Sequence, residues 1–99
     1  MQSAIQVKPV SVAVQANQPA FQMYTSGIIT KNCGTNVDHA ILAVGWGNDP
    51  VNGPYWIVEN SWGAAWGQNG YVLIGMSSTN AAGICGINQY VYYPITTYA

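Results

Sequence analysis

Apolar residues occur along this chain in short runs bounded by turn-forming residues. Residues 10–14, VSVAV, alternate at a period of two and predict a half-buried strand. Residues 40–46, AILAVGW, form a near-continuous apolar run, which is typical of a strand buried on both faces. Aromatic and β-branched residues favour extended structure in further short runs, at 28–30, 55–59, 71–74, 84–87 and 91–93.

The residues between these runs are mostly strong turn formers. The segment 47–54, GNDPVNGP, predicts a loop, and so do the Gly- and Trp-rich residues 60–70 and the polar residues 76–83. Residues 21–24 predict a single helical turn, and no pattern predicts a longer helix or an internal repeat. The sequence therefore predicts a mainly β domain, an antiparallel sheet of about six strands curled into a barrel or sandwich.

Charged residues are unusually few. The chain has 99 residues, so we expect a single domain spanning 1–99. Charged residues make up 5% of it, against about 25% in an ordinary domain, and they are Lys8, Lys31, Asp38, Asp49 and Glu59. With two basic residues the chain has no electrostatic footprint for nucleic acid or anionic lipid. It also lacks the acidic cluster of a calcium site, the Cys and His set of a structural zinc site, and an apolar run long enough to cross a membrane.

Two features bear on whether this chain works alone. Its surface is either simply neutral, made of Asn, Gln, Ser, Thr and Gly, or partly apolar and covered by another chain or domain. Residues 1–8 have neither the basic nor the apolar segment of a signal peptide. We interpret them as the remnant of a preceding helix or linker, and Met1 as an expression start inside a longer native chain.

The strands predicted on either side of the loop 47–54 are neighbours in a hairpin. A hairpin centred between Asp49 and Pro50 would place His39, the only histidine, opposite Asn60. Directly opposed residues lie on the same face with Cβ atoms about 4.5–5.5 Å apart, although a β-bulge would shift the register by one. The pattern therefore predicts an imidazole beside a carboxamide at the open end of the hairpin.

Such a pair has a chemical use. The amide oxygen of Asn60 would accept a hydrogen bond from one ring nitrogen of His39, which fixes the tautomer and leaves the other nitrogen free. A base with its orienting group is one half of a nucleophilic triad. Trp62, two residues beyond Asn60, could shield this hydrogen bond from water. The alternative is a histidine that is satisfied by a neighbouring amide and performs no chemistry.

Two segments resemble a known family. Residues 37–40, VDHA, with 44–47, VGWG, resemble the segment around the catalytic histidine of papain-like, specifically cathepsin L-like, cysteine proteases. Residues 55–71 contain the pattern NSWGxxWGxxGY, which is similar to the asparagine signature of the same family. Shorter matches extend the resemblance over about residues 9 to 95, and they lie at 9–12, 21–24, 27–28, 85–87 and 93–94.

The resemblance covers only the second half of such an enzyme. The family pairs a helical N-terminal domain, which carries the nucleophilic cysteine and an oxyanion-hole glutamine, with a C-terminal β-barrel, and the active site lies between them. This chain resembles the barrel, the right-hand half of the α+β papain-like fold, and contains no C-G-x-C-W element. The resemblance thus implies a peptide substrate and a partner, the missing helical domain. It also implies that the chain alone does not hydrolyse peptides.

The resemblance assigns roles around the cleft. His39 corresponds to the catalytic base and Asn60 to its orienting group. Trp62 corresponds to the shield of their hydrogen bond, and Asp38 to a cleft residue that contacts substrate backbone.

Three further residues correspond to the substrate pocket. Ala13, Ala40 and Tyr90 match positions that line the pocket for the second residue before the cut. None of them is charged, so the parent enzyme is expected to prefer an apolar side chain there, in a pocket that Tyr90 could make shallow. The alternative is that each merely packs in the barrel.

By resemblance, the two cysteines, Cys33 and Cys85, form a disulfide within this domain. The alternative makes Cys33, six residues before His39, a surrogate nucleophile. A disulfide would place the parent protein in a secretory or lysosomal compartment.

Two hypotheses of function remain. In the first, the chain is a fragment of a papain-like endopeptidase, recombinant or one chain of a two-chain form, and is active only when complemented. In the second, it is a free-standing, non-catalytic folding unit or binding module. In both, we expect no metal or other cofactor, and we expect the wall around His39, Asn60 and Trp62 to be exposed or covered by a second copy.

Overall fold

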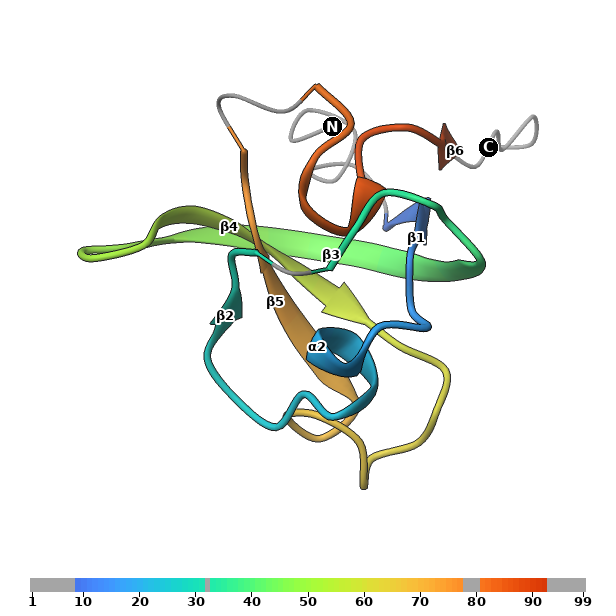
Figure 1. The fold of residues 1–99 in the computed structure, drawn as a ribbon. Helices are drawn as coiled ribbons and strands as arrows, with labels where there is room; N and C mark the ends of the chain where they lie inside the picture. Colours follow the sequence, from blue (N-terminus) through green and yellow to red (C-terminus); the bar gives the residue numbers. More distant parts are fainter. Residues whose placement is uncertain (1–8, 32, 78–80, 93–99) are drawn as a thin grey trace, which may run out of the picture.

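A single sheet of six strands organises the part of the chain that the computed structural model describes, residues 9–31, 33–77 and 81–92 (Figure 1). The strands are β1 (Val10–Val14), β2 (Ile28–Ile29), β3 (His39–Asp49), β4 (Gly53–Glu59), β5 (Tyr71–Gly75) and β6 (Val91–Tyr92). The described helical elements are the four-residue α2 (Pro19–Gln22) and the 3₁₀ turn η1 (Ile84–Gly86). The prediction of a mainly β domain is confirmed. The predicted remnant at 1–8 and the match at 93–94 lie outside the described residues.

The strand order is β2-β5-β4-β3-β1-β6, which makes an open sheet rather than the expected closed barrel. The two edge strands, β2 and β6, have two described residues each and are not paired with each other, so the sheet does not close. All pairs are antiparallel except β2 with β5, which run parallel. No helix within the described ranges has the length and apolar character that a membrane crossing requires.

One face of the sheet forms the core. Strand β1 alternates strictly between buried and half-buried residues, as its sequence predicts. Strand β3 does not match its prediction of two buried faces. Its first residues alternate: Ala40 and Leu42 are exposed, and Ile41 and Ala43 are buried. Across the sheet, the fully buried side chains on the inner face include Val10, Val12, Val14, Ala43, Val58, Val72 and Ile74. The outer face at the start of β3 is therefore open in this chain.

Two of the predicted elements need correction. Residues 84–87 do not form a strand, because Cys85 adopts a left-handed φ of 61° that extended backbone cannot contain. The single helical turn lies at α2, two residues earlier than the predicted 21–24, with Pro19 at its first turn, where its missing N–H costs nothing.

The β3–β4 hairpin has a different register from the predicted one. Gly45 pairs with Ile57, three residues beyond Pro54, which a hairpin centred between Asp49 and Pro50 would place opposite it. The reason is local: the Asp49 carboxylate accepts the backbone N–H groups of Val51 and Asn52 at 2.9 and 2.8 Å, which centres the turn on Val51. A β-bulge between Ala43 and Gly45 then shifts the pairing back by one residue, so that Ala43 pairs with Val58.

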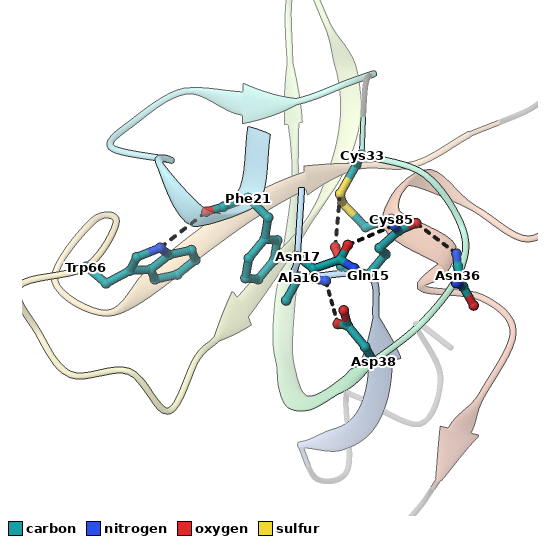
Figure 2. The surroundings of a disulfide bond; sticks show 9 residues. All are labelled: Gln15, Ala16, Asn17, Phe21, Cys33, Asn36, Asp38, Trp66 and Cys85. Atoms are coloured by element: carbon teal, nitrogen blue, oxygen red, sulfur yellow. Dashed lines mark hydrogen bonds between the residues drawn. A yellow bond between two sulfur atoms is a disulfide. The ribbon is translucent and has the colours of Figure 1, made fainter. Parts of the chain in front are cut away.

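The predicted disulfide is confirmed. Cys33 and Cys85 are joined across 52 residues of sequence, with an S–S distance of 2.02 Å. Figure 2 shows the bond beside Gln15, the residue that follows β1. The alternative in which Cys33 acts as a surrogate nucleophile is wrong, because both of the chain's cysteines are in this bond.

Candidate active site

His39 and Asn60 form a hydrogen bond, with Nε2 and Oδ1 2.8 Å apart. Asn60 is only 8% exposed, and its Oδ1 also accepts the backbone N–H of Ser61 at 2.7 Å. That N–H can only donate, so the contacting atom of Asn60 is the amide oxygen and His39 Nε2 must carry the hydrogen. In the neutral ring Nδ1 is then unprotonated and can accept a proton.

The two side chains meet although they are not opposite each other in the hairpin. His39 opens β3, where its backbone pairs with Val14 of β1. Asn60 directly follows β4, and its backbone N–H donates to the carbonyl of Gly70 at 2.9 Å, where the chain leaves the sheet. The predicted contact is present, but it joins the start of one strand to the loop after another.

An aromatic cluster packs against the His39 ring. The rings of Trp62 and His39 are stacked, with centroids 5.1 Å apart and an angle of 25° between their planes. Trp62 packs edge-on against Phe21 and Trp66, at 5.5 and 5.3 Å. Trp66 Nε1 donates to the carbonyls of Phe21 and Gln22, both at 3.2 Å, which fastens the loop 60–70 to α2 (Figure 2 draws the contact with Phe21).

We expect Trp62→Ala to expose the His39–Asn60 hydrogen bond to water. The Nε2 proton of His39 should exchange with solvent about tenfold faster, because the stacked ring no longer excludes water from it. Nitrogen-15 NMR of the imidazole measures this exchange. The control is Trp62→Phe, which retains a flat ring and should stay near wild type. Equal exchange rates in all three proteins would contradict the shielding role of Trp62.

Asp38 lies on the rim of a hollow of about 220 Å³ beside His39. Its Oδ1 accepts the N–H of Ala16 at 2.8 Å, and its own N–H donates to the carbonyl of Val14 at 2.9 Å. The hollow is lined by Ala16, Asn17, Gln22, Asp38, His39 and Trp62. The sequence assigns no site role to three of these residues: Gln22 lies within a family match, but no motif marks Ala16 or Asn17, which contribute through the position of their loop.

The three residues matched to a substrate pocket lie together. Ala13 and Ala40 are directly opposed in the β1–β3 ladder and so share one face of the sheet. The N–H of Ala13 donates to the carbonyl of Tyr90 at 3.1 Å, which brings this third residue alongside, with its side chain 50% exposed. These backbone pairings line up Ala40, Ala13 and Tyr90 in that order across the sheet, starting at the residue that follows His39.

A second hollow, of about 290 Å³, has Asn60 in its lining. Its lining comes from the start of β3 and the end of β4, and consists of Ala40, Ile41, Leu42, Glu59, Asn60 and Ser61. Among the described residues, no group of three His, Cys, Asp or Glu side chains is placed to hold a metal ion. The chain also has no free cysteine, so it holds a base without an attacking thiol.

Comparison with known proteins identifies the family. Residues 1–95 match the family described as papain family cysteine protease. The chain belongs to this family. Cysteine protease 1 of rice (Oryza sativa subsp. japonica) is 48% identical to the papain-family chain over 96 residues, which cover 96% of this chain and 20% of the rice protein. The resemblance that the sequence motifs carry is thus confirmed.

Solved papain-family structures agree in fold. Bromelain from Ananas comosus, in complex with the E64 inhibitor, superposes with a TM-score of 0.82 at 45% identity, covering 89% of this chain and 40% of that one. The Carica candamarcensis protease CMS1MS2, in complex with E-64, gives a TM-score of 0.85 at 43% identity, covering 94% and 41%. This papain-family chain therefore spans less than half the length of these relatives.

Proposed function

We propose that this chain supplies the base-bearing half of a papain-family cysteine endopeptidase. His39 is the general base and Asn60 its orienting group, while a helical domain outside this chain brings the nucleophilic thiol. The carrying observation is the 2.8 Å bond between His39 Nε2 and Asn60 Oδ1, which leaves Nδ1 as the ring nitrogen available to a thiol.

The proposed reaction runs through the two states of His39. Nδ1 takes the proton of the partner's thiol, and the thiolate attacks the peptide carbonyl carbon. The imidazolium then gives this proton to the leaving nitrogen, the C–N bond breaks, and an acyl-thioester remains on the partner. Water hydrolyses the thioester with Nδ1 again accepting a proton. Asn60 holds the ring plane throughout, since Nε2–H stays bonded to its oxygen.

Exposed residues on the outer face of the sheet favour the proposal of a partner domain. Leu42, Glu59 and Tyr71 are neighbours across β3, β4 and β5, and each is exposed, Leu42 by 38% and Tyr71 by 37%. This row borders the second hollow, directly beside Asn60. An apolar row with a single carboxylate fits a protein surface better than open water. The greater length of the relatives is consistent with such a domain.

The substrate side of the proposal rests on the cleft residues. Ala13, Ala40 and Tyr90 would form an apolar pocket for the second residue before the cut, because no charged group lies among them. Asp38 has one oxygen bonded to Ala16, which leaves the other for substrate backbone at the rim of the 220 Å³ hollow. The disulfide supports an oxidising compartment, secretory or lysosomal, for the parent protein.

A complementation assay tests the proposal. We expect this chain alone to leave a fluorogenic peptide intact, and the same peptide, with an apolar second residue, to be cut when the helical domain of a relative such as the rice protease is added. A mixture in which the helical domain carries serine in place of its nucleophile is the control. Tight binding of the two domains without turnover would instead favour a non-catalytic binding module.

A further inference from the structure

Gln15 is a buried polar residue that the proposed reaction does not use. It directly follows β1 and is 7% exposed. Burying a primary amide is costly unless its atoms are hydrogen-bonded, so its partners indicate what it is there to hold.

The side chain of Gln15 bonds the segment that leads to His39, residues 33–38, here called the approach segment. Its Oε1 accepts the backbone N–H of Asn36 at 2.9 Å (Figure 2). Its Nε2 donates to Asn17 Oδ1 at 2.8 Å, and its backbone N–H donates to the carbonyl of Cys85 at 2.8 Å. Gln15 therefore ties the approach segment to β1 and to the disulfide region at once.

The amide of Gln15 lies so close to the backbone of Gly34 that no side chain would fit at this position. A Cβ on Gly34 would overlap Gln15 Oε1, and the glycine has a φ of +77°. Only a residue without a side chain lets the amide lie flat against the approach segment.

The neighbours of Gln15 complete the attachment. The carbonyl of Val14 accepts the N–H of Asp38 at 2.9 Å, and the N–H of Ala16 donates to Asp38 Oδ1 at 2.8 Å. Three consecutive residues, 14–16, thus bond to Asn36 and Asp38, immediately before His39. We propose that Gln15 is a positioning residue, which sets the place of Asp38 and His39 relative to Asn60 without touching substrate.

This role rests on the proposed function of His39 as a base, but its test needs no peptidase activity. Nitrogen-15 NMR of the isolated chain follows the Nε2 proton of His39, whose slow exchange reports the bond to Asn60. Gln15→Met keeps the bulk of the side chain and removes its hydrogen bonds. We expect about tenfold faster exchange of this proton, the effect of losing one buried hydrogen bond, while core amides such as that of Val58 keep their protection.

Two matched variants separate positioning from general stability. Gln15→Glu retains an oxygen that can accept the N–H of Asn36 but loses the donor to Asn17, and its exchange should lie between those of the wild type and Gln15→Met. Gln89→Met makes the same change at an exposed glutamine whose Nε2 bonds the carbonyl of Thr35, in the same segment but further from His39, and should stay near wild type. An equal effect of both methionine variants would overturn the proposal.

A further variant covers the case in which Gln15→Met does not fold. Gly34→Ala leaves the residue at position 15 unchanged, but the added methyl group pushes the Gln15 amide away from Asn36. The proposal expects faster Nε2 exchange in this protein as well. Wild-type exchange in a folded Gln15→Met or Gly34→Ala chain would show that Gln15 serves packing alone. If the wild-type chain also cut the peptide when mixed with the helical domain, the proposed function would stand and only the positioning role of Gln15 would be rejected.

Discussion

In a two-domain protein assembled from this chain and a helical partner, His39→Ala is expected to lower kcat/KM for a peptide by about 10⁴-fold or more. His39 is the chain's only histidine, so no second imidazole can replace it in accepting the thiol proton. Because the imidazole also protonates the leaving nitrogen, both halves of the reaction lose their proton carrier. Steady-state kinetics of the assembled protein measure the loss.

The matched control is Val51→Ala at the tip of the β3–β4 hairpin. Val51 is 88% exposed and far from the site, so this variant should retain wild-type kcat/KM. The kcat/KM of Asn60→Ala should lie between those of His39→Ala and Val51→Ala, because the His39 ring is still present but is no longer held in orientation. Activity of His39→Ala within tenfold of wild type would reject His39 as the base.

Replacing both cysteines of the disulfide by serine is expected to lower the free energy of unfolding by about 4 kcal/mol, the loop-entropy value for a closed loop of this size. The bond spans 52 residues, more than half of the chain. A small domain has a free energy of unfolding of only about 5–15 kcal/mol, so this loss brings Cys33→Ser/Cys85→Ser close to unfolding. Urea titration followed by tryptophan fluorescence measures it.

The wild-type chain in reductant is the control for the serine side chains. It should lose the same stability as the double variant, since both lack the covalent link. A free energy of unfolding unchanged by either treatment would mean that the unfolded chain gains no freedom from losing the link, contrary to the loop-entropy account.

The sequence predicts the strands much better than their pairing. Alternation identifies β1 to the residue, because one face is buried and a shift by one would reverse every side chain. The hairpin register depends instead on how the Asp49 carboxylate caps the turn, and composition cannot distinguish this from a turn centred between Asp49 and Pro50. Closure of the sheet was equally beyond prediction, because it depends on two very short edge strands.

The site was predicted through its side-chain contact rather than its backbone. His39 and Asn60 meet as expected, yet through a different register, because the chain turns after β4 and a long imidazole bridges the remaining gap. Ala16 and Asn17, which line the same hollow as His39, carry no recognisable pattern. Their contribution comes from the path of the loop between β1 and α2, which is a property of the folded chain.

The length of the β3–β4 hairpin separates its tip from the chemistry. His39 begins β3 and the turn lies beyond Asp49, so at about 3.3 Å per residue roughly 30 Å of strand lies between them. Figure 1 shows the tip standing away from the remainder of the sheet. An epitope inserted at Val51, or a fluorescent label attached there, would project into solvent at the hairpin tip and leave the imidazole of His39 undisturbed.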